Sequence, residues 1–152
     1  MKNTTFTHAF ARAFSLIIIC LAVFAFTEKT GLDSYEIYLN DKLLLKHYVN
    51  QPLNLRMLQL EKAEVDDQLF IRYTHCNIKG AGTSRSIVIK DTQGHPLKEW
   101  QFADATGSDE GMSIPVKELV QLEKENVNQE LRMHYTANEL PTGEMLASIR
   151  LN

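Results

Sequence analysis

The side chains best suited to hold a metal ion or to move a proton are His75 and Cys76, which are adjacent, and His134, far along the chain. Together with Met133 and Met145, these residues include the imidazole and sulfur ligands that copper favours. Neighbouring residues of a strand point to opposite faces, so His75 and Cys76 cannot serve one site on a regular strand. We therefore expect no metal and no cofactor. A small exported enzyme or metal carrier built on His75, Cys76 and His134 is the alternative function.

Two loops contain residues that could bind ions, but neither has the complete pattern of a binding loop. In 104–110 oxygen-bearing side chains alternate, yet Gly107 is fourth in the loop and Pro115 is twelfth, where an EF-hand needs glycine at position six and glutamate at position twelve. The glycines of 80–85 precede a strand pattern, whereas phosphate-binding glycine loops precede a helix. No nucleophile-elbow signature accompanies the serines. The chain is therefore predicted not to be an enzyme.

A third set consists of polar residues that alternate with the apolar residues of their strands and therefore point to the opposite face of the sheet. Its members come from three predicted strands, near 68–76, 129–137 and 144–152. If those strands adjoin, they form a locally basic face on an acidic protein, which suits an anionic partner or a glycan. The predicted binding residues are Arg72, Thr74, Arg132, His134 and Arg150, with Thr136 and Ser148 beside them.

Alternation of apolar and polar residues predicts β-strands along most of the chain after residue 33. Asn40 and Asp41 are turn-forming residues between two such runs, so 34–49 is predicted to be a hairpin. A closing hairpin is predicted around a turn at 141–143. The other predicted strands are 53–60, 68–76, 85–91 and 97–103, and the closing hairpin comprises 129–137 and 144–152.

One segment departs from the strand period. Val116, Leu119 and Val120 recur at helical spacing, and Pro115 suits the first turn of a helix. A short helix is therefore predicted near 115–126. About eight short strands separated by regular turn signals predict a mainly β fold, an antiparallel β-sandwich or small barrel, with this helix crossing one end.

The N-terminus has the three parts of an export signal. Lys2 and Arg12 supply positive charge, an uncharged and mostly apolar run follows over 13–26, and the small or branched residues of 23–25 allow a cleavage after Ala25. We therefore expect 1–25 to be a signal peptide.

Residues 26–152 are expected to form a single β-rich globular domain that is periplasmic or secreted. If the signal is not cleaved, residues 10–26 are the expected membrane anchor, and the domain lies on the same side of the membrane. Cys20 lies within the signal, so the mature domain keeps Cys76 as its single cysteine. A lone cysteine allows no internal disulfide and no multi-cysteine zinc site.

The net charge of the chain limits the kinds of partner that it is expected to bind. Sixteen Lys and Arg stand against 19 Asp and Glu, for a net charge of −3, and loss of Lys2 and Arg12 with the signal would change this to about −5. A nucleic-acid binder has the opposite sign and clustered basic residues, so nucleic acid is excluded. We expect a non-enzymatic binding or interaction module of a bacterial envelope, with a protein or a surface ligand as its partner.

Overall fold

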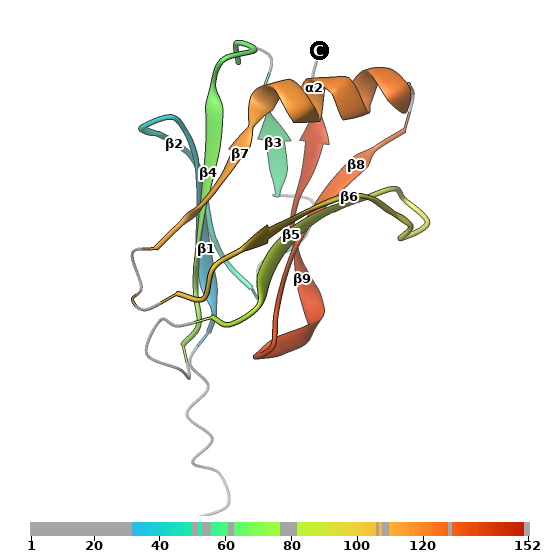
Figure 1. Cartoon of the computed structure of the whole chain (residues 1–152). Coiled ribbons are helices and arrows are strands. Elements are labelled where there is room, and N and C mark those ends of the chain that lie inside the picture. Colours follow the sequence, from blue (N-terminus) through green and yellow to red (C-terminus); the bar gives the residue numbers. More distant parts are fainter. Residues whose placement is uncertain are drawn as a thin grey trace, which may run out of the picture. The chain divides into compact units, whose positions relative to one another are not determined.

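Two β-sheets packed face to face form the fold of this chain (Figure 1). The computed structural model describes residues 32–49, 52, 56–60, 63–76, 82–105, 107, 110–127 and 129–150. The predicted signal peptide, or anchor, lies outside the described residues. Within these ranges, no helix combines the length and the hydrophobicity needed to span a lipid bilayer.

The first sheet has four strands in the order β2-β1-β4-β7, with every neighbouring pair antiparallel. β1 (Ser34–Leu39) and β2 (Lys42–Tyr48) form the predicted hairpin, which turns at Asn40 and Asp41. Asn40 has a φ of 51°, a conformation that asparagine tolerates better than most residues. The other two strands are β4 (Gln68–Thr74) and β7 (Met112–Pro115).

The second sheet has five strands in the order β3-β9-β8-β5-β6. β3 is short and pairs with β9 in parallel, whereas the other neighbours are antiparallel. These strands are β3 (Met57–Gln59), β5 (Arg85–Lys90), β6 (Pro96–Phe102), β8 (Leu131–Ala137) and β9 (Leu140–Arg150). The prediction of a mainly β, mostly antiparallel sandwich is therefore confirmed, with nine strands in the described part of the chain.

Alternating apolar residues place the core between the two sheets. In β4, Leu69, Ile71 and Tyr73 are buried, while Phe70 and Arg72 between them face outward and are only partly covered. Each fully buried large apolar side chain stabilises the fold by roughly 1.5–3 kcal/mol, so this layer is the main source of stability. Its other members include Ile37, Met112 and Ile114 in the first sheet, and Ile87, Ile89, Met133 and Ala147 in the second.

The short helix predicted near 115–126 is α2 (Val116–Glu125), which lies across one end of the sandwich (Figure 1). It buries Val116 and Leu119 as the apolar spacing predicted, together with Leu122, whereas Val120 is only partly buried. Pro115 is not in its first turn but is the last residue of β7 and the N-cap of the helix. Because β7 is an edge strand, the missing N–H of a proline there costs no hydrogen bond between strands.

The closing hairpin turns earlier than predicted. The turn is at Asn138 and Glu139, and residues 141–143, predicted as the turn, lie inside β9. Gly143 has a φ of 69°, so β9 is irregular at this point without being interrupted. A proline-threonine-glycine sequence signals a turn locally, but the pairing of β8 with β9 extends beyond it.

A bulge in β9 also changes which side chains face inward. Met133 pairs with Ala147, but His134 pairs with Met145, which leaves Leu146 as an extra residue between the two pairs. The extra residue reverses the alternation that the sequence shows. Leu146 is therefore fully buried, while Met145, which regular alternation with Ala147 and Ile149 would turn toward the core, is only partly buried and lies beside the outward-facing His134.

Candidate functional site

The residues of the predicted basic face belong to two different sheets. Arg72 and Thr74 are on β4 of the four-stranded sheet, whereas the others are on β8 and β9 of the five-stranded sheet. Strand parity predicts which face a residue takes, but not which sheet its strand joins. A single face with all of the predicted residues is therefore not formed. Those that stay together are Arg132, His134, Thr136, Ser148 and Arg150.

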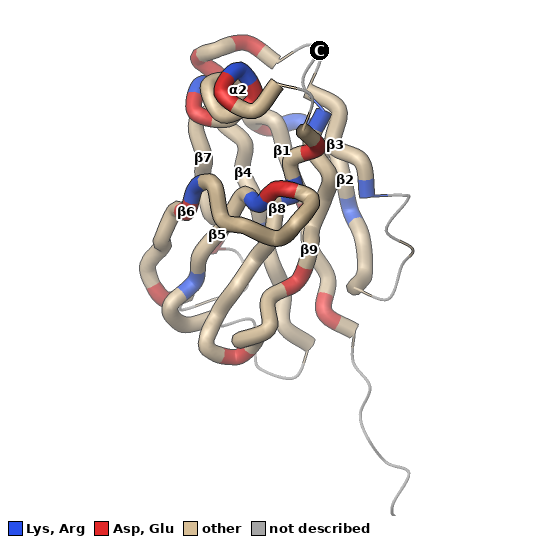
Figure 2. Tube along the Cα trace, turned by 90° about the vertical axis from the view of Figure 1, so that its right-hand side faces the viewer, with Lys and Arg blue, Asp and Glu red and all other residues tan. Residues whose placement is uncertain are grey.

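On the five-stranded sheet, the carboxylate of Glu130 offsets part of the positive charge of the arginines. Arg132 Nε donates a hydrogen bond to Glu130 Oε1 at 3.0 Å, and Ser148 Oγ donates to the same oxygen at 2.7 Å. The bonds from Ser148 and then Arg132 hold the pKa of Glu130 below its usual range, so the carboxylate is ionised at neutral pH. Figure 2 shows basic and acidic segments interspersed along the described chain. This face therefore has less positive charge than its arginines suggest.

His134 lies on that outer face as a neutral side chain. Burial lowers its pKa to about 4, with smaller contributions from the positive charges of Lys90 and Arg132. A neutral imidazole among basic neighbours adds no attraction for an anion at neutral pH.

We expect His134 to make the domain sensitive to acid. The unfolded chain binds a proton at this imidazole near pH 6.5, whereas the folded protein resists protonation down to about pH 4. Between these values the unfolded state binds more protons, so stability falls as the pH falls. Urea unfolding of His134→Gln should lose about 2 kcal/mol less stability between about pH 7 and pH 4 than the wild type does. The same pH dependence in both proteins would contradict this expectation.

His75, Cys76 and His134 do not meet in one site. His75 lies between the sheets with 5% of its surface exposed, and Cys76 is exposed. Tyr135, the residue after His134 in β8, contacts His75 from the inner face, so the two histidines lie on opposite faces of this sheet. Within the described ranges, no three side chains of His, Cys, Asp or Glu are grouped so that they could hold a metal ion.

Asp33, His75 and Tyr135 instead form a row of close polar contacts, in which His75 and Tyr135 are buried and Asp33 is partly exposed. His75 Nδ1 is 3.2 Å from Asp33 Oδ2, and His75 Nε2 is 3.0 Å from the Tyr135 hydroxyl. The order of carboxylate, imidazole and hydroxyl is that of a nucleophile with an oriented base. Tyr135 is only 1% exposed, however, and burial raises its pKa to about 12. A shielded phenol that keeps its proton holds the two sheets together and offers nothing to a substrate.

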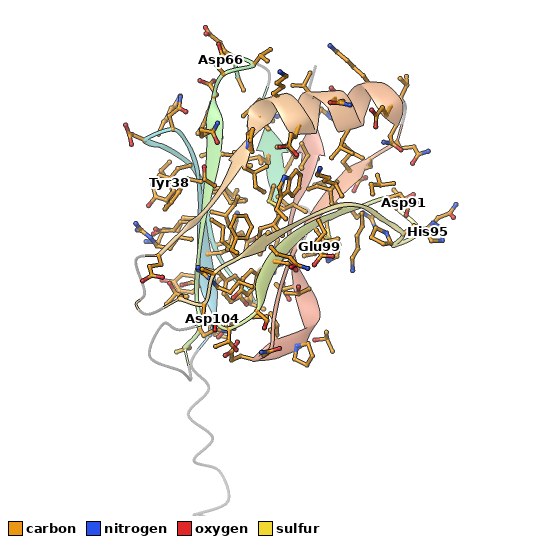
Figure 3. All side chains as sticks on the ribbon, in the orientation of Figure 1. Tyr38, Asp66, Asp91, His95, Glu99 and Asp104 are labelled. Atoms are coloured by element: carbon orange, nitrogen blue, oxygen red, sulfur yellow. The ribbon has the colours of Figure 1, made fainter. Side chains whose placement is uncertain are left out.

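A pocket of about 360 Å³ lies on the outer face of the four-stranded sheet. Tyr38 of β1 and Phe70 of β4 meet edge to face, with ring centroids 6.2 Å apart and planes at 64°. The Arg72 guanidinium lies 5.8 Å from the centre of the first ring and 6.0 Å from that of the second. Figure 3 shows Tyr38 on the side of its sheet that faces away from the other sheet. This Tyr38 pocket is lined by Tyr38, Asn40, Asp41, Gln68, Phe70, Arg72 and Ser113.

Glu36 links the charged groups beside the Tyr38 pocket. Its carboxylate lies 2.7 Å from Lys46 Nζ and 3.3 Å from Arg72 Nη1, and it accepts the Tyr38 hydroxyl at 2.7 Å. Hydrogen bonds from Lys46 and then Tyr38 hold the pKa of Glu36 below its usual range. Because Lys46 and Arg72 share this carboxylate, both positive charges beside the pocket already face a negative charge.

Hydrogen bonds between the hairpin turn and the neighbouring strands fix the polar rim. Asn40 Nδ2 donates to Asp67 Oδ1 at 2.8 Å, and the backbone N–H of Gln68 donates to Asn40 Oδ1 at 2.9 Å. Ser113 Oγ donates to Gln68 Oε1 at 3.1 Å, which joins β7 to β4. Polar groups held in this way are preorganised for a ligand.

Gly111 sets the position of the Phe70 ring. A Cβ atom at residue 111 would lie 1.9 Å from Phe70 Cζ, so the ring rests directly on the glycine backbone. Any larger residue there would push the ring out of its place in the Tyr38 pocket.

A second pocket, of about 400 Å³, lies at the β5–β6 end of the other sheet. Its buried cation, Arg85, donates to the carbonyl oxygens of Ala103 at 2.9 Å and Glu110 at 2.7 Å, and Asp104 accepts the N–H of Ser84 at 2.7 Å. These groups hold the adjoining loop, and no aromatic pair is present among the residues that line this pocket. The Tyr38 pocket is therefore the better candidate for a binding site.

No protein-family model, curated protein or solved structure matches this chain. Its function is therefore inferred from its own residues. Of the residues that line the Tyr38 pocket, the sequence pattern identified Arg72 as a binding residue and missed the two aromatic rings. The sequence contained a signal for both rings. Phe70 lies two residues before Arg72 and so points to the same outer face of the sheet, and Tyr38 lies beside the hairpin turn.

Proposed function

We propose that this chain is an exported, non-enzymatic binding module and that the Tyr38 pocket is its ligand-binding surface. The observation that carries the proposal is an open depression in which two aromatic rings and a guanidinium are held together by contact. Apolar walls with a few placed polar groups are the usual composition of ligand sites in proteins.

The content of the pocket favours binding over catalysis. Among the described residues that line it, Asp41 is the single carboxylate, and no histidine or cysteine is present. General acid–base chemistry needs a proton donor and acceptor matched to the operating pH, and nucleophilic chemistry needs an activated group. Neither is provided at this site, whereas hydrogen-bonding amide and hydroxyl groups are.

The N-terminal pattern of Lys2 and Arg12 before an apolar run supports export, to the periplasm or outside the cell. A protein or a surface ligand of the envelope is then the partner that such a module meets.

Gly111→Ala is expected to abolish ligand capture, because the added methyl group displaces the Phe70 ring while leaving the core layer between the sheets untouched. The folded domain would be immobilised and incubated with an extract of its native envelope fraction, and bound material identified by mass spectrometry and sugar analysis. The wild type should retain material that Gly111→Ala does not.

Gly107→Ala is the matched control, because a Cβ at residue 107 meets nothing within 4 Å. It should capture as the wild type does. A double variant, Arg132→Ala with Arg150→Ala, tests the outer face of the five-stranded sheet. Loss of capture in this double variant with full capture by Gly111→Ala would show that the proposed surface is wrong.

A further inference from the structure

We propose that the ligand of the Tyr38 pocket is a neutral polysaccharide chain, which also contacts Tyr48 on the same face of the four-stranded sheet. This inference rests on the proposed function and names the chemical class of its ligand.

The pairing of both cations with Glu36 argues against an anionic ligand. Lys46 and Arg72 both face the carboxylate of Glu36, at 2.7 Å and 3.3 Å. An anion would have to compete with this carboxylate for both cations. A neutral ligand binds without breaking the network.

The polar groups of the pocket suit hydroxyl groups in particular. The guanidinium of Arg72 only donates hydrogen bonds, the carboxylate of Asp41 only accepts them, and the side chains of Asn40, Gln68 and Ser113 carry groups that do both. A sugar hydroxyl donates and accepts at once, so it can use each kind of partner in this mixture.

The aromatic rings supply the apolar component that a sugar needs. A pyranose ring presents a face of C–H groups, which pack on an aromatic ring, and an edge of hydroxyl groups, which reach polar side chains. Tyr38 and Phe70 meet edge to face, and the Arg72 guanidinium contacts both rings. This pair of rings, the first platform for a sugar, is therefore already ordered before a ligand binds.

A second exposed aromatic ring on the same face, that of Tyr48, indicates that the ligand is a chain of sugars rather than a single sugar. Tyr48 of β2 is 48% exposed and is paired with Ser34 of β1, four residues before Tyr38. At about 3.3 Å per residue, the two tyrosines are about 13 Å apart along the strand. Leu43, paired with Tyr38 and 47% exposed, continues the apolar surface beside the first platform. A ligand that contacts both tyrosines must therefore be extended.

The test is a titration of the folded domain, followed by NMR, with neutral β-1,4-linked hexasaccharides of glucose, xylose, mannose and N-acetylglucosamine, and with the matching disaccharides. Oligogalacturonate provides an acidic chain of similar length. At least one neutral hexasaccharide should bind, more tightly than its disaccharide and more tightly than oligogalacturonate.

Tyr38→Ala should weaken binding of that hexasaccharide by about tenfold or more, and Tyr38→Phe should retain most of it, since stacking needs the ring and not the hydroxyl. Tyr48→Ala should weaken the hexasaccharide by about tenfold and leave the disaccharide unchanged. Met57→Ala, which removes an exposed apolar side chain from the other sheet, should leave both unchanged.

Tighter binding of oligogalacturonate, or no binding of any neutral hexasaccharide, would overturn this inference. The proposed function would survive that result if Gly111→Ala still lost a captured protein. If capture were the same for Gly111→Ala and Gly107→Ala, the proposed function itself would fail.

Discussion

Replacing Arg56 with alanine is expected to lower the free energy of unfolding by about 3–5 kcal/mol. Only 2% of this side chain is exposed. Its Nη1 lies 2.5 Å from Glu144 Oε1 and 2.7 Å from the Met145 carbonyl oxygen, and its Nη2 donates to the carbonyl oxygen of Val49. The substitution therefore leaves a carboxylate and two carbonyl groups without their donor and opens a large cavity. For a domain with a total stability of about 5–15 kcal/mol, this is a large fraction.

The experiment separates the lost charge from the lost volume. Arg56→Met keeps most of the volume and should cost less than Arg56→Ala in urea unfolding. Arg56→Met combined with Glu144→Leu should recover further stability, because an apolar pair of similar volume often replaces a buried ion pair without loss. A cost below about 1 kcal/mol for Arg56→Ala would show that the guanidinium does not hold these elements together.

Replacing Tyr73 with alanine is expected to cost about 3–5 kcal/mol, as removal of a buried aromatic ring usually does. Its ring stacks on Tyr135 of the opposite sheet with centroids 4.1 Å apart, and it lies 4.8 Å from the His75 ring and 6.4 Å from the Tyr35 ring. The ring is thus the middle member of an aromatic stack that crosses from one sheet to the other.

Tyr73→Phe is the matched control, since it keeps the stack and removes only the hydrogen bond from the hydroxyl to Asp33 Oδ2, which is 3.0 Å long. Its expected cost is about 1 kcal/mol. Thermal and urea unfolding of both variants would measure the difference. Equal costs for the two variants would mean that the hydroxyl, and not the stack, matters at this position.

The strands and the helix were largely predictable because their signals are local. Alternation in β4 and in the hairpin of β1 and β2 follows from the residues of each strand, and α2 follows from the spacing of Val116 and Leu119. The bulge at Leu146 was not predictable, since it depends on how β9 pairs with β8. The early turn at Asn138 was missed for the same reason.

The candidate site was only partly predictable, because it depends on which strands join one sheet. Arg72 was identified from its phase, but it was grouped with Arg132 and Arg150, which lie on the other sheet. Tyr38 and Phe70 come together because β1 pairs with β4, and the two strands are separated by β2 and β3 in the chain. The sequence distance conceals that pairing.

The pairing of β3 with β9 bears on when the chain can fold. Met57 is paired with Ser148, and the Tyr35 hydroxyl donates to the Leu146 carbonyl oxygen, 111 positions later in the sequence. Contacts so distant along the chain give a high contact order and slow folding, on a scale of about milliseconds to seconds. A chain that still lacks β9 has no partner strand for β3 and no acceptor for the Tyr35 hydroxyl. Complete pairing of the five-stranded sheet therefore waits for β9, the last strand of the described chain.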